Sequence, residues 1–380
     1  MTTRSLTDSL KTQMIATEDD TTRRLARIWQ DLLGVRSIGL DQNYFDLGGD
    51  SPLAVQLFAQ IEKAFRVKLP LATLFEAPTI EELAQILRRE ASAPRWSPLV
   101  AIQPDGSRPV FFCVHGAGGN VLIYRELSQN LGSDQPFYGL QSPGLDGSGP
   151  PLTRIEEMAE LYVKEIRAVQ PYGPYFLGGY CMGGTIAYEM AQQLRAQGEH
   201  VALLALFDTL NWYKMPFPSI WGKGYHAGER LLFHAANFFK LDSVGKAKFF
   251  WEKAKVLRTR IPVWRGKVLR KLVKNSQPAK SKSRVLGQIW ALNDLAAIDY
   301  APQPYPGVIT DFRPVKQYRR CKNPALKWDH LAEGGQEIVV LPVYPAGMLV
   351  KPFVKHLAVA LRKAIDAAIS QSAFGSQGGR

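Results

Sequence analysis

The chain has 380 residues, of which 46% are hydrophobic and 21% are charged, a composition that excludes a mainly disordered protein. Its length predicts two domains of unequal size. The absence of an eighteen-residue apolar run argues against a membrane-spanning helix, and the polar N-terminus lacks the apolar core of a secretory signal. The three cysteines lack the spacing of a disulfide framework or a zinc site, so we expect no metal and a reducing, cytoplasmic setting.

The net charge of +13 is concentrated in one segment. Residues 1–90 contain 11 basic and 13 acidic residues, a net charge of −2, whereas residues 214–284 contain 18 basic and 3 acidic residues, a net charge of +15. Basic proteins often bind nucleic acid or an anionic membrane. Because the excess of positive charge is local, it is a property of that segment and not of the whole chain.

The sequence predicts a small α-helical bundle over residues 21–90, after an N-terminal linker at 1–20. Apolar residues recur at helical spacing over 25–33, and Gly34 marks the end of that helix. The same periodicity predicts a second helix over 53–61.

A third helix is predicted to begin after Thr79. Thr79 is suited to be its N-cap, and Glu82, three residues later, completes a capping box. The stretch at 91–98, rich in small residues and proline, predicts a linker to a second domain.

From residue 99 to 369, short apolar strands alternate with helices. Strands are predicted at 110–114, 175–177 and 201–207, and each is followed by glycines or a polar residue and then by helix-compatible sequence. This alternation is typical of a mostly parallel sheet covered by helices. Ligands bind such sheets at the carboxyl ends of the strands, so we expect the chemistry there. The Gly- and Ser-rich end at 370–380 predicts a disordered tail.

A glycine turn, Phe45-Asp-Leu-Gly-Gly-Asp-Ser51, delivers a serine to the start of the second helix. Alone, this motif is equally explained by Asp50 or Ser51 as a simple N-cap. Together with the flanking helices and Ala-Pro-Thr-Ile before the third one, it makes residues 21–90 resemble the peptidyl carrier protein domains of nonribosomal peptide synthetases. Pro52 stands where the family usually has leucine, and proline is tolerated at a first helical position.

This resemblance implies that Ser51 carries a covalent 4′-phosphopantetheine arm, whose thiol holds an acyl or peptidyl chain as a thioester. It also implies several partners. A phosphopantetheinyl transferase would attach the arm, and upstream adenylation and condensation domains would supply the chain.

A second motif, Gly179-Tyr-Cys181-Met-Gly183, follows a predicted strand and begins a helix. Its glycines allow a sharp turn that presents the central side chain at the top of the sheet and at the helix N-terminus. The simpler interpretation is a small buried cysteine, because free cysteines are usually buried.

Two further motifs accompany this turn: His115-Gly-Ala-Gly-Gly119 upstream and Leu-Phe-Asp208 downstream. With them, residues 99–369 resemble the type I thioesterase domains that end peptide and polyketide assembly lines. The resemblance implies an α/β-hydrolase fold with a large helical lid insertion at about 212–290.

In that family the central residue of the turn is the nucleophile, which is Cys181 here in place of the usual serine. The acid of the catalytic triad maps onto Asp208. The backbone N–H groups that form the oxyanion hole map onto Ala117 and Met182.

The histidine of the triad is missing from its usual place. Aligning Met348, Leu349 and Pro352 with the family pattern puts Pro345 in the histidine position. A lid histidine, His226 or His234, is an alternative base.

A cysteine at position 181 is chemically compatible with the absence of a histidine base. A thiol is partly ionised at neutral pH, and more so at a helix N-terminus, so Cys181 can accept an acyl group without a base. Water would still need a base to attack the acyl-Cys181, whereas an amine needs less help. We therefore expect release by transfer to an amine or by cyclisation.

Three alternatives stay open at this stage. One is simple hydrolysis with a lid histidine as base, and another is a carrier fused to a catalytically degenerate docking domain. The third is that Cys181 is an introduced replacement for serine.

The basic segment has no nucleic-acid recognition module, so we expect no nucleic acid as a partner. The simplest interpretation is a solvated basic face on lid helices. Phe249, Phe250, Trp251 and Trp264, interleaved with lysines, also fit an anionic membrane surface. An acidic substrate or the acidic carrier is the remaining alternative.

Overall fold

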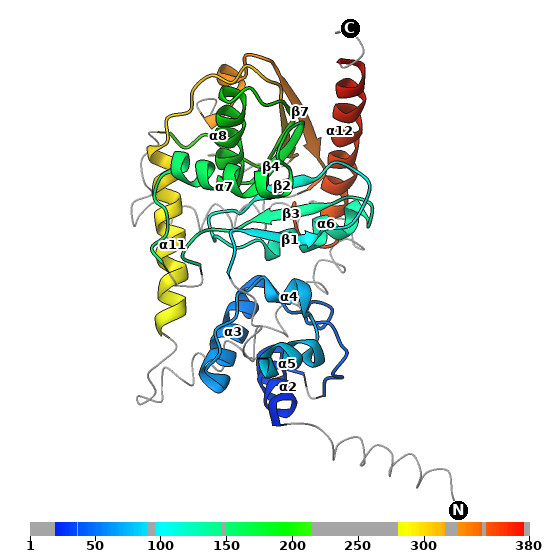
Figure 1. Ribbon diagram of the computed structural model, residues 1–380, viewed down its shortest axis with the longest axis vertical. Helices are drawn as coiled ribbons and strands as arrows, with labels where there is room; N and C mark the ends of the chain where they lie inside the picture. The colour runs from blue at the N-terminus through cyan, green and yellow to red at the C-terminus, as the bar shows by residue number, and fades with distance from the viewer. Residues whose placement is uncertain are drawn as a thin grey trace, which may run out of the picture. The chain divides into compact units, whose positions relative to one another are not determined.

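The computed structural model describes residues 20–35, 37–89, 96–145, 149–213, 280–315, 326–343 and 347–375 (Figure 1). Contacts between residues divide the described part of the chain into two compact units, with the boundary at Ser97. The predicted N-terminal linker up to residue 19, the linker residues 90–95 and the lid residues 214–279 lie outside the described residues. In the described residues, no helix is both long and apolar enough to cross a membrane.

The first unit is helical, and its helices are α2 (Asp20–Leu33), α3 (Ser51–Phe65), α4 (Thr73–Glu76) and α5 (Ile80–Arg88). Their apolar faces meet in a core in which Leu25, Trp29, Leu57 and Leu83 are fully buried. The three predicted helices are confirmed, whereas the single turn of α4 was too short to show a periodicity.

The predicted ends of these helices are also confirmed. Helix α2 ends at Gly34, whose N–H donates to the Gln30 carbonyl at 2.8 Å. At the start of α5, the Thr79 hydroxyl accepts from the Glu82 N–H at 3.2 Å, and the Glu82 carboxylate accepts from the Thr79 N–H at 3.1 Å. This is the predicted capping box.

The second unit is built on a seven-stranded sheet with the order β1-β3-β2-β4-β5-β6-β7. Strand β1 is antiparallel to β3, and the other neighbours are parallel. The strands are β1 (Leu99–Gln103), β2 (Phe111–Val114), β3 (Phe137–Leu140), β4 (Tyr175–Tyr180), β5 (Val201–Phe207), β6 (Ile309–Pro314) and β7 (Gln336–Leu341). The predicted mostly parallel sheet is confirmed, with the antiparallel β1 as an edge strand.

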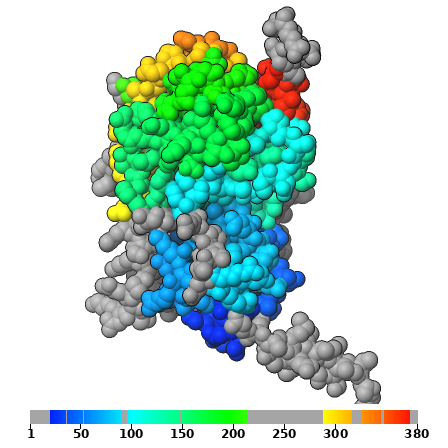
Figure 2. Space-filling model, in the orientation of Figure 1, coloured from blue at the N-terminus to red at the C-terminus, as the bar shows by residue number. Residues whose placement is uncertain are grey.

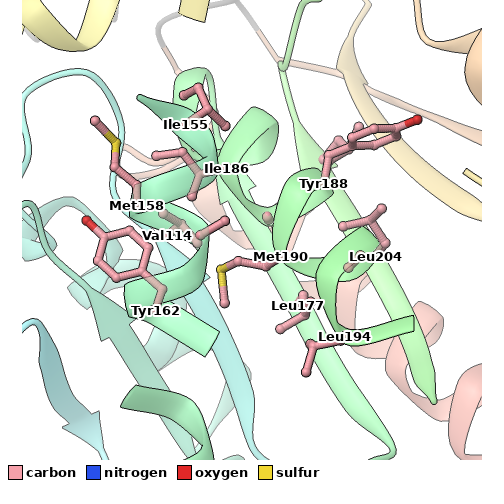
Figure 3. Close-up of a cluster of buried hydrophobic side chains, with 14 of the residues drawn as sticks. Val114, Ile155, Met158, Tyr162, Leu177, Ile186, Tyr188, Met190, Leu194 and Leu204 are labelled. Carbon is pink, nitrogen blue, oxygen red and sulfur yellow. The ribbon is translucent and has the colours of Figure 1, made fainter. Parts of the chain in front are cut away.

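Helices cover both faces of the sheet (Figure 1). Helix α7 (Ile155–Val169) packs against α8 (Met182–Ala196), and α6 (Arg125–Leu131) packs against α12 (Val354–Gly375). Side chains from β2, β4 and β5 join α7 and α8 in one buried cluster (Figure 3). The alternate residues of β2, Phe111 and Cys113, are also fully buried, so the opposite face is covered as well.

Helix α11 (Lys280–Asp299) begins inside the predicted lid segment and precedes β6 in the chain. Its second half packs on the core, because Asn293, Ala296 and Ala297 are buried. The predicted lid boundary at residue 290 therefore falls inside a helix.

Helix α12 is longer than predicted. The expected disordered tail at 370–380 is wrong for Ser370 to Gly375, which continue the helix. The glycines on which that prediction rested begin only at Gly375, and the Ser370 hydroxyl donates to the Asp366 carbonyl at 3.0 Å. Figure 2 shows the C-terminal part of α12 at the surface of this unit. Residues 376–380 lie outside the described residues.

Candidate active site and carrier serine

Cys181 lies in a sharp turn between β4 and α8. It is the N-cap of α8, with φ 55° and ψ −122°, a backbone conformation that costs free energy in a residue with a side chain. A Cβ atom added at Gly179 would overlap the backbone of Gly183, and one added at Gly183 would overlap the Val114 carbonyl oxygen. The sharp turn that the sequence predicted therefore requires both glycines, because the backbone approaches each of them closely.

The turn leaves the Cys181 side chain partly exposed. Its N–H donates to the Phe207 carbonyl at 3.0 Å, and its carbonyl accepts from the Gly184 N–H at 3.1 Å. The sulfur therefore belongs to the N-terminus of a 15-residue helix, where the helix dipole favours a negative charge.

Asp208 follows β5 directly and lies beside this turn, because Cys181 bonds to the carbonyl of the preceding residue, Phe207. It is partly buried, has φ 46°, and donates its N–H to the Phe312 carbonyl at 2.9 Å. Of the described non-glycine residues, Arg66, Cys181 and Asp208 have positive φ. Two of the three thus lie at the carboxyl edge of the sheet, where strain often marks a functional site.

The predicted oxyanion groups lie on the two segments that flank Cys181. Met182 is the first residue of α8, so its N–H has no acceptor within the helix. Ala117 lies in the loop after β2, where the Gly116 carbonyl accepts from the Gly119 N–H at 2.9 Å and from Nδ1 of His115 at 2.7 Å. Because N–H and C=O point in opposite directions across a trans peptide, these bonds direct the Ala117 N–H away from Gly116 O. In the described part of the chain, neither N–H donates to another residue, as an oxyanion hole requires.

His115 is fully buried and holds this loop in place. A carbonyl can only accept, so Nδ1 carries the proton, and Nε2 accepts from the Tyr162 hydroxyl at 2.8 Å. Burial lowers the pKa of His115 to about 4. The ring is therefore neutral, has both nitrogens engaged, and is unsuited to be the missing base. Figure 3 labels Tyr162 on α7, beside Val114 of β2.

The position predicted to replace the histidine, Pro345, lies outside the described residues, as do His226 and His234. His200 immediately precedes β5 and so lies at the amino edge of the sheet, away from Asp208. The structure thus brings Cys181 and Asp208 to one edge of the sheet.

Sequence reasoning missed Asn293 of α11. Its Nδ2 donates to the Ala117 carbonyl at 2.9 Å, and its side chain is fully buried. The signal in the sequence was a polar pair, Asn293 and Asp294, in an otherwise apolar stretch from Ile289 to Ala297. The partner of Asn293 is 176 residues away.

In the first unit, Ser51 is the partly exposed first residue of α3. Gly48 before it has φ +92° with open space around it, and a Cβ atom at Gly49 would overlap the Tyr44 ring. Asp50 caps the helix by accepting the Leu53 N–H at 2.8 Å. The N-cap role proposed as the simpler interpretation thus belongs to Asp50, and the neighbouring serine lies where a helix N-terminus favours a phosphate. These residues fit a phosphopantetheine group.

Two family descriptions match the sequence. One is "Phosphopantetheine attachment site", over residues 23–87, and the other is "Thioesterase domain", over residues 109–215. The chain is a carrier–thioesterase didomain. It carries covalently attached 4′-phosphopantetheine, and its second domain is a thioesterase-like acyl-release enzyme.

Several curated relatives are peptide synthetases. Malpinin synthetase of Mortierella alpina is 44% identical over 196 residues, which are 51% of this chain and 2% of that protein. The dimodular nonribosomal peptide synthase of Bacillus subtilis (strain 168) is 41% identical over 192 residues, which are 50% of this chain and 8% of that protein. The didomain therefore spans a small fraction of the length of these relatives.

Solved structures agree on the fold. A four-domain nonribosomal peptide synthetase, solved in its holo form with AMP and glycine, has a TM-score of 0.55 and 27% identity, over 91% of this chain and 26% of its own. The NocB thioesterase domain, solved as a covalent complex with a fluorophosphonate nocardicin G analogue, has a TM-score of 0.50 and 22% identity, over 70% of this chain and 99% of its own. The second similarity supports the predicted α/β-hydrolase fold and no more.

Proposed function

We propose that the didomain releases a chain carried on Ser51 through an acyl intermediate on Cys181, by transfer to an amine or by cyclisation. The placement of Cys181 carries the proposal. Cys181 is the N-cap of α8 and directly precedes Met182. Gly183, in the same turn, lies against the carbonyls of Val114 and His115, where the loop that holds Ala117 begins. A serine at this position would need a base, whereas a thiol does not.

The first half-reaction moves the chain from one sulfur to another. The phosphopantetheine arm supplies a thioester with a reactive carbonyl. Cys181 loses its proton to solvent, and its thiolate attacks the carbonyl carbon. The N–H groups of Ala117 and Met182 bind the negative charge that develops on the oxygen. When the carbonyl re-forms, the bond to the sulfur of the arm breaks, and the departing thiolate takes a proton from solvent. One thioester replaces another, so the step is nearly balanced in free energy.

The second half-reaction breaks the bond to Cys181. An amine nitrogen attacks the acyl carbon, the Cys181 thiolate leaves, and the nitrogen loses a proton to solvent, which forms an amide. Asp208 lies at the same edge of the sheet and orients the amine by accepting a hydrogen bond from it. If the amine belongs to the carried chain, the product is a ring.

The partners follow from the same proposal. A phosphopantetheinyl transferase modifies Ser51, and adenylation and condensation domains supply the chain. An anionic membrane beside the basic segment is part of the proposal, although residues 214–279 lie outside the described residues.

The test uses holo-protein loaded at Ser51 with an acyl or peptidyl chain. It is incubated in buffer alone and with a small primary amine, and products and protein adducts are identified by mass spectrometry. We expect an amide product and a transient acyl group on the Cys181 peptide. With Cys181→Ala, the chain should stay on Ser51.

Cys113 is the internal control, because it is fully buried and its peptide should stay unmodified. Rapid release of free acid in buffer alone, abolished by Cys181→Ala, would establish hydrolysis in place of transfer. A Cys181 that never acquires an acyl group would indicate a carrier fused to a degenerate docking domain.

A further inference from the structure

Helix α11 touches three successive residues of the loop that holds Ala117. Asn293 bonds to the Ala117 carbonyl at 2.9 Å. A Cβ atom added at Gly118 would lie 3.4 Å from the Trp290 ring, and one added at Gly119 would lie 3.0 Å from the Ile289 side chain. Positions 289, 290 and 293 share one side of a helix, so one helix surface covers the loop.

Although the Asn293 side chain is fully buried, only part of its amide is hydrogen-bonded to the described residues, so it adds little to the free energy of unfolding. Its Nδ2 must face Ala117, because a carbonyl oxygen can only accept. Its Oδ1 is then buried and has no hydrogen-bond partner among the described residues. A buried acceptor without a partner is destabilising. An apolar side chain of the same size would remove this acceptor but leave the Ala117 carbonyl without its donor, so the net change in stability should be small.

Asn293 instead fixes the direction of a peptide group. The two peptide planes that flank Ala117 are each held by their carbonyl: His115 donates to Gly116 O at 2.7 Å, and Asn293 donates to Ala117 O at 2.9 Å. The Gly116–Ala117 peptide contains the Ala117 N–H, and the bonds to Gly116 O set the direction of that N–H. The Ala117–Gly118 peptide begins at the same residue, so the Asn293 bond ties Ala117 to α11 and sets where its N–H lies. We propose that Asn293 is a positioning residue for the oxyanion N–H of Ala117. This inference rests on the proposed function, because it assumes an acyl transfer at Cys181.

The test compares two reactions of Cys181 in the full chain. Acylation by an acyl-N-acetylcysteamine thioester develops an oxyanion, whereas alkylation by iodoacetamide displaces iodide and develops none. With Asn293→Leu and Asn293→Ala, we expect acylation to slow about 10- to 100-fold. This is a smaller effect than the removal of a direct oxyanion donor has. Alkylation should keep its wild-type rate. Asn293→Leu should also keep a melting temperature near that of the wild type, because the Ala117 carbonyl that it leaves unpartnered replaces the unpartnered Oδ1 that it removes.

The matched control is Gln288→Ala, which removes an exposed amide from the same helix and should leave both rates unchanged. Equal acylation rates in wild type and Asn293→Leu would overturn the inference. So would a parallel fall of acylation and alkylation, since that indicates structural damage. If the wild-type protein itself is not acylated at Cys181, the proposed function has failed instead.

Discussion

Gly183 is the position where one added methyl group would disturb both halves of the candidate active site. A Cβ atom there would overlap the carbonyl oxygens of Val114 and His115. Both oxygens belong to the backbone at the end of a fully buried strand, so neither can rotate away. Gly183→Ala therefore forces α8 away from β2, which separates the N–H of Met182 from that of Ala117.

The size of the effect follows from these clashes. Overpacking a buried site typically costs 1–3 kcal/mol, and two rigid contacts put Gly183→Ala near the upper end, at about 3 kcal/mol. For a domain of this size, that lowers the melting temperature by roughly 6–12 °C. Acylation of Cys181 should fall by about 100-fold, as expected when an oxyanion donor is misplaced.

Differential scanning calorimetry and the thioester assay measure these two effects. The control is Gly287→Ala on α11, where a Cβ atom has open space and an ordinary φ. It should stabilise the protein by about 0.5–1 kcal/mol, because alanine is the better helix former. A Gly183→Ala protein that melts like the wild type and is acylated at the wild-type rate would refute this account of the turn.

Three more outcomes are expected. Thr79→Ala removes the capping box of α5 and should destabilise the first unit by about 1 kcal/mol, seen as faster hydrogen exchange of the α5 amides in the full chain; unchanged exchange would contradict it. Burial lowers the pKa of His115 from 6.5 to about 4, so the neutral ring stabilises the fold above pH 6.5 and loses this contribution, about 3 kcal/mol, as the pH falls to 4. His115→Asn, with an amide in place of Nδ1, should show a smaller loss over that pH range in urea unfolding, and an equal loss would assign it to other groups. Ser51→Ala should keep the mass of the unmodified protein after treatment with coenzyme A and a phosphopantetheinyl transferase, and any mass gain would place the arm elsewhere.

Local signals in the sequence were sufficient to predict most of the helices and strands. The capping box at Thr79 acts over three residues, and the strand predicted at 201–207 is bounded by polar residues on both sides. The sharp turn of the Gly179–Gly183 motif could also be predicted, because the strand, turn and helix that form it are contiguous. Such features depend on neighbours within one turn or one strand.

The parts that sequence reasoning missed depend on distant partners. Asn293 meets Ala117 across 176 residues, and Tyr162 meets His115 across 47. Neither pair has a spacing that a periodicity can show. His115 was visible as part of a motif, but only the structure shows that both of its ring nitrogens are occupied.

The strained turn explains why a cysteine can stand where the family has serine. The conformation of Cys181 is imposed by the close packing of Gly179 and Gly183 and by its bond to the Phe207 carbonyl, none of which involves the Cys181 side chain. The backbone therefore presents either nucleophile at the same place. The choice between them depends on the base. The buried, neutral His115 cannot take the proton of a serine hydroxyl, and the proposed function avoids this requirement because a thiol is more easily ionised than a hydroxyl.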